Sequence, residues 1–265
     1  HRIARRQRQM CIRDSAHIGK GVIIEPYAIV ESGAEIGEDC SIEAHAIVKS
    51  HAKLGKGVSV GHFSVVGGDP QHLTFDRERS SFVVVGSETR IGEGVTIHRS
   101  IDEKGITMIG EKSFLMGNSH VGHDCFLGRE VILANGALLG GHVSLGNQAF
   151  IGGGAGIHQF VRIGKGAMIG GMSEVTADVP PHVTISGRNH ACGLNLIGLK
   201  RRNASNSEIS ELKKLYRLML VKPGNLTKRA KEFKGDDGIA KSQIGIEFID
   251  FFLTGKRGFV RSRKV

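Results

Sequence analysis

An aliphatic residue recurs at every sixth position through most of the chain. The frame runs from Ile18 to Val66, returns over residues 85–97, and holds again from Ile109 to Val175. These stretches amount to roughly two dozen hexads, a repeat typical of a parallel β-helix. The periods of an α-helix and of a coiled coil, about 3.6 and 3.5 residues, do not divide six, so the pattern excludes both.

The core of such a coil must be built from small and β-branched side chains. A small or β-branched residue comes four positions after most of the aliphatic ones, as at Ala28, Ala34 and Ala46, and aromatic residues make up only 5% of the sequence. A six-residue unit cannot bury its own apolar face, so successive units must stack. A glycine-rich low-complexity segment would not keep one phase over residues 109–175.

The frame breaks at two places and ends near a proline pair. The breaks, near residues 67–84 and 100–108, predict loops on one side of the coil, where repeat proteins usually carry their binding face. Pro180–Pro181 favours an end to the coil, because proline cannot donate to a β ladder. We therefore expect a mainly β chain, with a β-helix over residues 15–187 and a small α-helical domain over residues 188–265.

The expected C-terminal domain carries helix signals of its own. Ser205 or Ser207 can cap a helix whose apolar residues recur at three- and four-residue spacing and which ends at Lys222–Pro223–Gly224. A last amphipathic helix is predicted over residues 244–253.

The formal charge of +10 would ordinarily suggest a polyanionic partner such as nucleic acid. Five arginines in residues 1–14 supply half of it, and +10 − 5 leaves about +5. That opening segment has neither strand nor helix periodicity and resembles a translated sequencing adapter, so we expect it to be non-native. Nucleic acid is also disfavoured because the stacking aromatics of single-strand binders are missing.

The four cysteines are far apart and form no C-x-x-C pair, which favours reduced thiols over a disulfide framework or a zinc ribbon. No run of eighteen or more apolar residues occurs, and no apolar signal-peptide core lies near the start. We therefore expect a cytoplasmic protein without stable membrane insertion.

The hexads resemble those of the hexapeptide acyltransferase superfamily, whose three-sided, left-handed β-helix takes three hexads per coil. Eighteen residues per coil would place His123, Gly141 and Gln159 on one edge of successive coils, about 4.8 Å apart. His142 and His158 are their sequence neighbours. The histidines are therefore predicted to converge on one stripe.

The stretch "NSHVGHDCFLG", residues 118–128, offers two kinds of chemistry. An imidazole titrates near neutrality, so His123 suits general-base catalysis, with Asp124 or a backbone carbonyl fixing its tautomer. A zinc site is the alternative. It is disfavoured because His120 and His123 are three residues apart and would point to opposite faces of an extended strand.

Four ordered motifs narrow the resemblance to the UDP-N-acetylglucosamine O-acyltransferases, the family that opens lipid A synthesis. They are "NSHVGHDCFLG", "LLGGHVSLG", "GIHQF" and "GLNLIGLKRRN", and the likeness covers about residues 15–261. It implies that His123 deprotonates the sugar 3-hydroxyl, which attacks the thioester of a 3-hydroxyacyl carrier protein. It further implies that the N–H of Gly141 binds the oxyanion, a role that suits glycine.

The same resemblance implies a homotrimer with active sites between subunits, and neither a metal nor a cofactor. It assigns Gly171, with Met172 beside it, to the limit on acyl length, and a glycine there implies room for a long chain. It assigns the remaining contacts with UDP-N-acetylglucosamine and the acyl group to Gln71, His72, Thr74, His98, His120, His142, His158, Gln159, Asn195, Arg201 and Arg202.

Two departures from the family pattern leave the acceptor sugar open. Gln71–His72–Leu73–Thr74 stands where many relatives read Q-D-L-K, and Ile197 stands where many carry a glutamate near the uracil. The acceptor could therefore be a UDP-diamino sugar that takes the acyl group on nitrogen.

Two other functions stay open. One is the N-acyltransferase acting later in the same pathway, which has an additional N-terminal domain that residues before Ser15 are too few to form. The other is a non-catalytic hexapeptide scaffold, in which the histidines are surface residues.

Overall fold

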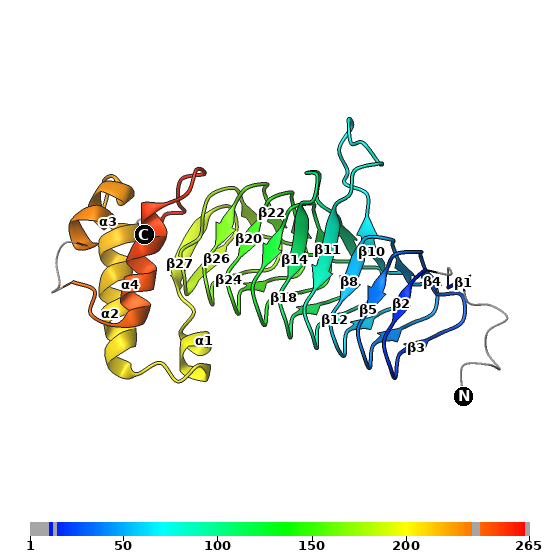
Figure 1. Ribbon diagram of the computed structural model, residues 1–265. Helices are drawn as coiled ribbons and strands as arrows, with labels where there is room; N and C mark the ends of the chain where they lie inside the picture. Colours follow the sequence, from blue (N-terminus) through cyan, green and yellow to red (C-terminus); the bar gives the residue numbers. More distant parts are fainter. Residues whose placement is uncertain (1–10, 13–14, 235–238, 263–265) are drawn as a thin grey trace.

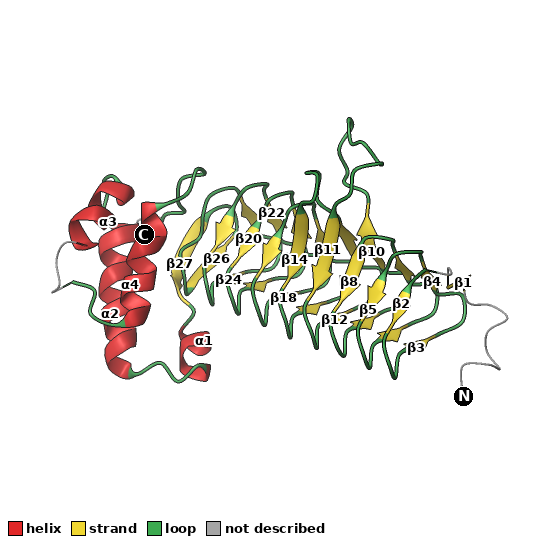
Figure 2. Ribbon diagram, viewed as in Figure 1, coloured by secondary structure: helices red, strands yellow, loops and turns green. Residues whose placement is uncertain are grey.

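The computed structural model describes residues 11–12, 15–234 and 239–262. Figure 1 shows an elongated coil of short strands with a group of helices at its C-terminal end, and Figure 2 shows that loops and turns link nearly all of the strands. The predicted hexapeptide β-helix followed by a small helical region is confirmed.

The strands form three parallel sheets that make the three sides of the coil. Sheet 1 contains β1 (Cys11–Ile12), β4 (Ile29–Val30), β7 (Ile47–Val48), β10 (Val65–Gly68), β13 (Thr96–His98), β16 (His120–Val121), β19 (Leu138–Leu139), β22 (Gly156–Ile157) and β25 (Glu174–Val175). Sheet 2 contains β2 (His17–Ile18), β5 (Glu35–Ile36), β8 (Ala52–Leu54), β11 (Phe82–Val85), β14 (Ile106–Ile109), β17 (Phe126–Leu127), β20 (Ser144–Leu145) and β23 (Arg162–Ile163). Sheet 3 contains β3 (Ile23–Ile24), β6 (Ser41–Ile42), β9 (Ser59–Val60), β12 (Arg90–Ile91), β15 (Phe114–Leu115), β18 (Ile132–Leu133), β21 (Phe150–Ile151), β24 (Met168–Ile169), β26 (Val183–Ser186) and β27 (His190–Leu194).

The register gives each aliphatic residue its counterpart one coil away. Val121 pairs with Leu139, which pairs with Ile157, so a coil takes 139 − 121 = 18 residues. These inward residues are almost completely buried, whereas their outward neighbours are partly exposed. Each buried aliphatic side chain stabilises the coil by roughly 1.5–3 kcal/mol, so the column of hexads holds it together.

Turns join the sheets at three edges, which we name by the sheets they connect: edge 1–2, edge 2–3 and edge 3–1. Both breaks in the hexad frame lie at edge 1–2, as residues 69–81 between β10 and β11 and residues 99–105 between β13 and β14. Figure 1 shows the first of these loops projecting from the coil beside β10. The two insertions therefore share one side of the molecule.

The coil extends further than expected at both ends. β1 pairs with β4 in frame, with Ile12 beside Val30, so the repeat reaches into the segment we expected to be non-native. The five arginines of that segment lie outside the described residues. At the other end, β27 runs antiparallel to β26 and carries sheet 3 to Leu194, beyond the expected boundary at residue 187.

The helical region contains α1 (Leu196–Arg201), α2 (Asn206–Tyr216), the π-helical turn η3 (Arg217–Val221), α3 (Leu226–Lys234), α4 (Gln243–Asp250) and the 3₁₀ turn η4 (Phe251–Leu253). Ser205 caps α2 in a capping box with Glu208, and Lys222 ends η3, as predicted. α4 and η4 coincide with the predicted last helix. The sequence did not reveal α1, α3 or the hairpin of β26 and β27.

Candidate active site

The turns of edge 1–2 bring the predicted catalytic residues onto successive coils. Within the turn after β16, Nδ1 of His123 lies 2.7 Å from Oδ2 of Asp124. The two side chains are only 16% and 11% exposed. His123 is therefore more enclosed than a solvated turn histidine, and its ring is held by a carboxylate.

The carboxylate of Asp124 is itself fixed on several sides. Oδ1 accepts a hydrogen bond from the Ser100 hydroxyl, and Oδ2 accepts one from the backbone N–H of Ile101 at 3.2 Å. Burial alone would raise the pKa of Asp124, but hydrogen bonds from His123, Ser100 and Ile101 outweigh it and lower the pKa below its ordinary value. Asp124 is therefore an anion that keeps the proton of His123 on Nδ1.

Gly141 lies against the His123 ring, one coil further on. A Cβ at position 141 would come within 2.6 Å of Nε2 of His123 and 2.5 Å of its Cε1, so only glycine leaves space for the imidazole. Among the described residues, the N–H of Gly141 has no acceptor, whereas its carbonyl accepts from Phe160 at 3.0 Å. The residue that lies against the His123 ring thus has a backbone N–H free to bind an oxygen that develops negative charge.

His142 completes the corner. Its ring meets the His123 ring edge to face at 5.1 Å and stacks on Phe160 at 4.5 Å. Nε2 of His142 lies 3.8 Å from Oδ2 of Asp124, beyond a normal hydrogen bond. Asp124, His142 and Phe160 all adopt positive φ, a conformation that non-glycine residues seldom take, at equivalent positions of three successive turns of edge 1–2.

His123, Asp124 and His142 also form a compact set of potential metal ligands, with donor atoms within 4.8 Å of one another. Ligand atoms around a tetrahedral zinc ion lie about 3.3 Å apart. The 2.7 Å between Nδ1 and Oδ2 is instead the length of a charge-assisted hydrogen bond. The set therefore fits a hydrogen-bonded dyad better than a metal site, and His120 does not belong to it.

A groove of about 660 Å³ runs along the outer face of sheet 1 and leads to this edge. Gln71, His120 and His158 line it together with Leu138 and Glu174. Its length brings the first insertion and five successive coils, from β13 to β25, to one depression. A groove of this size can hold a nucleotide sugar or part of an acyl chain.

The histidines beside the groove are kept neutral. Burial, followed by the neighbouring His123, lowers the pKa of His120, whose Nδ1 lies 2.8 Å from the Thr96 hydroxyl. Burial, then His120 and His123, lowers the pKa of His98 to about 4. Near neutral pH these rings can exchange hydrogen bonds with sugar hydroxyls without adding charge.

Arg257 was not predicted from the sequence. Its Nη2 lies 2.7 Å from Nδ1 of His158, and its Nε donates to the carbonyl of Gln159 at 3.1 Å. The guanidinium also lies 5.9 Å from the ring centre of Phe160. Arg257 follows the last helix by several residues, and no short-range pattern links it to edge 1–2.

Two other predicted groups lie on other edges. Asn195 caps α1 and donates to the Gly166 carbonyl at 3.0 Å on edge 2–3, where Arg202 lies 3.3 Å from Nδ1 of His182. Gly171 and Met172 lie on edge 3–1, with Met172 82% exposed. Within one chain, Asn195, Arg202 and the acyl-length residues therefore do not join the dyad, whereas His158 and Gln159 lie on its edge.

The predicted loop residues Gln71, His72 and Thr74 lie in the first insertion. Gln71 reaches the groove, whereas Nδ1 of His72 lies 3.3 Å from the Thr74 hydroxyl on the exposed loop. Arg201 lies at the exposed end of α1. None of these three side chains, His72, Thr74 or Arg201, contacts the dyad in the described hydrogen bonds.

The three-sided coil of hexads defines a hexapeptide-repeat transferase, and a family model for bacterial hexapeptide transferases matches residues 15–50. A second model, described as UDP N-acetylglucosamine O-acyltransferase domain 2, matches residues 178–260. The chain is 39% identical over 257 residues to an acyl-[acyl-carrier-protein]–UDP-N-acetylglucosamine O-acyltransferase of Paraburkholderia phymatum, covering 94% of this chain and 97% of that protein.

Solved structures of UDP-N-acetylglucosamine acyltransferases are similar to this chain over nearly its whole length. UDP-N-acetylglucosamine acyltransferase from Campylobacter jejuni superposes with a TM-score of 0.88 at 34% identity, covering 97% of this chain and 99% of the other. The Francisella novicida enzyme gives 0.91 at 30% identity, covering 96% and 93%. The chain belongs to the UDP-N-acetylglucosamine O-acyltransferase family.

Proposed function

We propose that the protein transfers a 3-hydroxyacyl group from acyl carrier protein to the 3-hydroxyl of UDP-N-acetylglucosamine, the first step of lipid A synthesis. The observation that carries the proposal is the dyad. Asp124 holds the proton on Nδ1 of His123, so Nε2 keeps its lone pair, and Gly141, whose N–H has no acceptor among the described residues, lies against the same ring. An imidazole arranged in this way is a general base next to an oxyanion donor.

The reaction then runs through two proton transfers on one nitrogen. Nε2 of His123 takes the proton of the sugar 3-hydroxyl as its oxygen attacks the thioester carbonyl. The carbonyl oxygen becomes an anion that accepts from the N–H of Gly141. When the C–S bond breaks, Nε2–H returns the proton to the departing thiolate of the carrier, and an ester remains on the sugar.

The nucleotide would lie further along the edge. His158 lines the groove, Gln159 follows it in the turn after β22, and Arg201 and Arg202 have the guanidinium forks that suit phosphate. His120 and His98, both neutral, would contact the sugar together with Gln71, and His142 the acyl group. Gly171 and Met172 would limit the acyl chain on edge 3–1.

A homotrimer would reunite these groups, because a neighbouring chain can present edge 2–3 or edge 3–1 to the dyad of the first. An apolar strip on the outside of sheet 3 supports such an assembly. Phe114, Ile132, Phe150 and Met168 stack on one another along four coils and are partly exposed in the single chain. Strips of this kind are usually covered by a partner.

Acyl carrier protein is the proposed donor, and the cytoplasm, where both proposed substrates are available, is the proposed compartment. Among residues 11–12, 15–234 and 239–262, no helix combines the length and the apolar character that crossing a bilayer requires.

Product analysis by mass spectrometry tests the proposal. The protein is incubated with UDP-N-acetylglucosamine and 3-hydroxyacyl carrier proteins of several chain lengths, and we expect one acyl group per sugar, released by alkaline hydroxylamine as an ester is. A hydroxylamine-resistant product formed only from a UDP-diamino sugar would instead support N-acyl transfer, which the exposed Ile197 and the residues at positions 72 and 74 keep open. No product from any donor would leave the scaffold function.

A further inference from the structure

Two adjacent residues, Arg99 and Ser100, join the first insertion to the catalytic dyad. They begin the second insertion, which lies at edge 1–2 between the coil that carries residues 69–81 and the coil that carries His123. The two side chains contact different partners. Arg99 contacts the first insertion, residues 69–81, and Ser100 contacts the carboxylate of Asp124.

Arg99 is buried beneath the loop, its side chain only 4% exposed. Its Nε donates to Oδ1 of Asp69 at 3.0 Å, and its Nη2 donates to the carbonyl of Arg77 at 2.8 Å. Nη1 donates to the carbonyl of Arg79, and the guanidinium lies 4.9 Å from the ring centre of Phe75. One side chain thus holds the loop at its start, its middle and its end.

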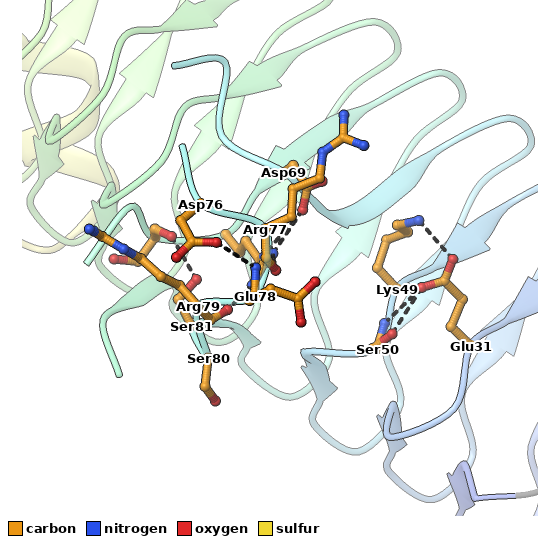
Figure 3. Close-up of polar contacts among 12 residues, drawn as sticks. Glu31, Lys49, Ser50, Asp69, Asp76, Arg77, Glu78, Arg79, Ser80 and Ser81 are labelled. Atoms are coloured by element: carbon orange, nitrogen blue, oxygen red, sulfur yellow. Dashed lines mark hydrogen bonds and ion pairs between the residues drawn. The ribbon is translucent and has the colours of Figure 1, made fainter. Parts of the chain in front are cut away.

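Figure 3 shows these loop residues, with Asp69 beside Arg77 and with Arg79, Ser80 and Ser81 in the part of the loop that leads to β11. A buried guanidinium is costly unless all of its donors are satisfied. Only the folded loop supplies two carbonyls and a carboxylate here, so Arg99 and the loop stabilise each other.

Ser100 is fully buried on the other side of the same segment. Its hydroxyl donates to Oδ1 of Asp124 and accepts from the N–H of Asp102 at 3.0 Å. Its carbonyl accepts from the Ser81 hydroxyl at 2.6 Å, so the end of the first insertion bonds directly to the residue that holds Asp124. Because Ser100 occupies Oδ1, Oδ2 remains directed at His123.

We propose that Arg99 and Ser100 are positioning residues of the acyl transfer: Arg99 holds the 69–81 loop for the acceptor sugar, and Ser100 holds Asp124 in the orientation that His123 needs. The inference rests on the proposed function. It divides the roles, because Arg99 acts on binding through the loop and Ser100 acts on the chemical step through the dyad.

For Ser100, the test is Ser100→Ala, with Ser100→Cys as a second variant that keeps the size. Loss of a hydrogen bond to a charged group should lower kcat by about 10- to 100-fold, while KM for the UDP-sugar changes by less than about twofold. The matched control is Ser64→Ala. Ser64 is also fully buried and donates to a carbonyl at 2.6 Å and accepts from an N–H at 3.0 Å, but it lies away from Asp124. We expect Ser64→Ala to be less stable than the wild type and to have the same kcat.

A double-mutant cycle with Asp124→Asn separates positioning from general support. If Ser100 acts through Asp124, adding Ser100→Ala to Asp124→Asn should lower kcat by less than about twofold more. If Ser100→Ala lowered kcat as much in Asp124→Asn as in the wild type, the role of Ser100 would be overturned.

For Arg99, the test is Arg99→Met, with Arg99→Lys as a milder variant. We expect KM for the UDP-sugar to rise about tenfold or more and kcat to fall by less than about threefold, because the loop and not the dyad is released. Arg77→Met is the control, since the exposed Arg77 side chain also pairs with Asp69, at 3.5 Å, and should change KM little. Equal losses in kcat for Arg99→Met and Ser100→Ala would contradict the division of roles.

Two readouts do not depend on turnover and separate this inference from the proposed function. Hydrogen exchange of residues 69–81 should speed up in Arg99→Met but not in Arg77→Met, and the NMR signal of the His123 Nδ1 proton should broaden or vanish in Ser100→Ala. If the wild type is inactive but the variants show both changes, the proposed function alone is refuted. If the wild type is active but the variants show neither change, the positioning roles are refuted.

Discussion

Gly141 illustrates how much the site depends on single residues. The hexad frame needs no glycine at this position, but a methyl group there would meet the His123 ring at about 2.5 Å. We expect Gly141→Ala to lower kcat at least tenfold with a shift in Tm of only a few degrees, because the imidazole can swing outward while the coil stays packed. The measurements are steady-state kinetics and thermal unfolding.

Gly117→Ala is the matched control, since a Cβ there first meets the flexible amide of Asn135 at 3.2 Å on another edge. Equal activity in Gly141→Ala and Gly117→Ala would show that the ring does not need this space.

His182 makes the folded protein sensitive to acid. Burial, then Arg202 and Lys165, lowers its pKa from 6.5 to about 4, and Glu247 opposes this only in part. Between these two values the unfolded chain binds more protons than the folded one, so stability should fall as the pH drops from about 6.5 to about 4, by at most about 3 kcal/mol from this residue.

Denaturant unfolding at pH 7, 6 and 5 measures this effect, and His182→Gln, which cannot take up the proton, should flatten the decline. An equally steep decline in the variant would assign acid sensitivity to other groups, such as His98, whose pKa is also lowered to about 4.

At the scale of elements, the repeat made the coil predictable. The insertions and the helical region, which have no repeat, were much harder to predict. The strict six-residue frame predicted the β-helix and placed His123, Gly141 and Gln159 on one edge, because stacking at 18 residues follows from the period. The support of Asp124 by Ser100 and the contact of Arg257 with His158 could not be predicted, since each joins segments whose separation no periodicity fixes. α1 was missed because it has only 6 residues, and α3 because its buried residues, Leu226 and Ala230, make too weak an apolar repeat.

A buried ion pair contributes to the junction between coil and helical region. Asp178, its side chain 1% exposed, accepts from Nε of Arg162 at 2.7 Å, and Nη2 of Arg162 donates to the carbonyls of Phe251 and Thr254 at 3.1 and 2.6 Å. Arg162→Met would leave a buried charge unpaired, so we expect a loss of about 3–5 kcal/mol in the free energy of unfolding and faster hydrogen exchange over residues 251–259.

Lys53→Met is the control for that variant. It breaks an exposed pair with Glu35 and should cost less than about 1 kcal/mol. Similar losses in the two variants would mean that the Arg162 pair does not fasten the helical region.

At the scale of the whole molecule, the distribution of site residues over three edges predicts shared active sites. In the proposed homotrimer, His123→Ala and Arg202→Ala should each be nearly inactive, but the two variants should regain activity when they are unfolded together and refolded into mixed assemblies. With random mixing, about a quarter of the sites combine an intact His123 from one chain with an intact Arg202 from its neighbour, so we expect about a quarter of wild-type activity. Recovery no greater than the sum of the two variants would mean that each chain builds its own site.

The central claim is that His123 is the general base of acyl transfer. The most direct measurement compares kcat of wild type and His123→Ala with the acyl carrier protein donor, after circular dichroism has shown that both are folded, and with His45→Ala as a control histidine stacked between Tyr27 and Phe63 on edge 3–1. We predict a loss of about 10²- to 10⁴-fold for His123→Ala and wild-type turnover for His45→Ala. Turnover of His123→Ala within tenfold of wild type would contradict the account.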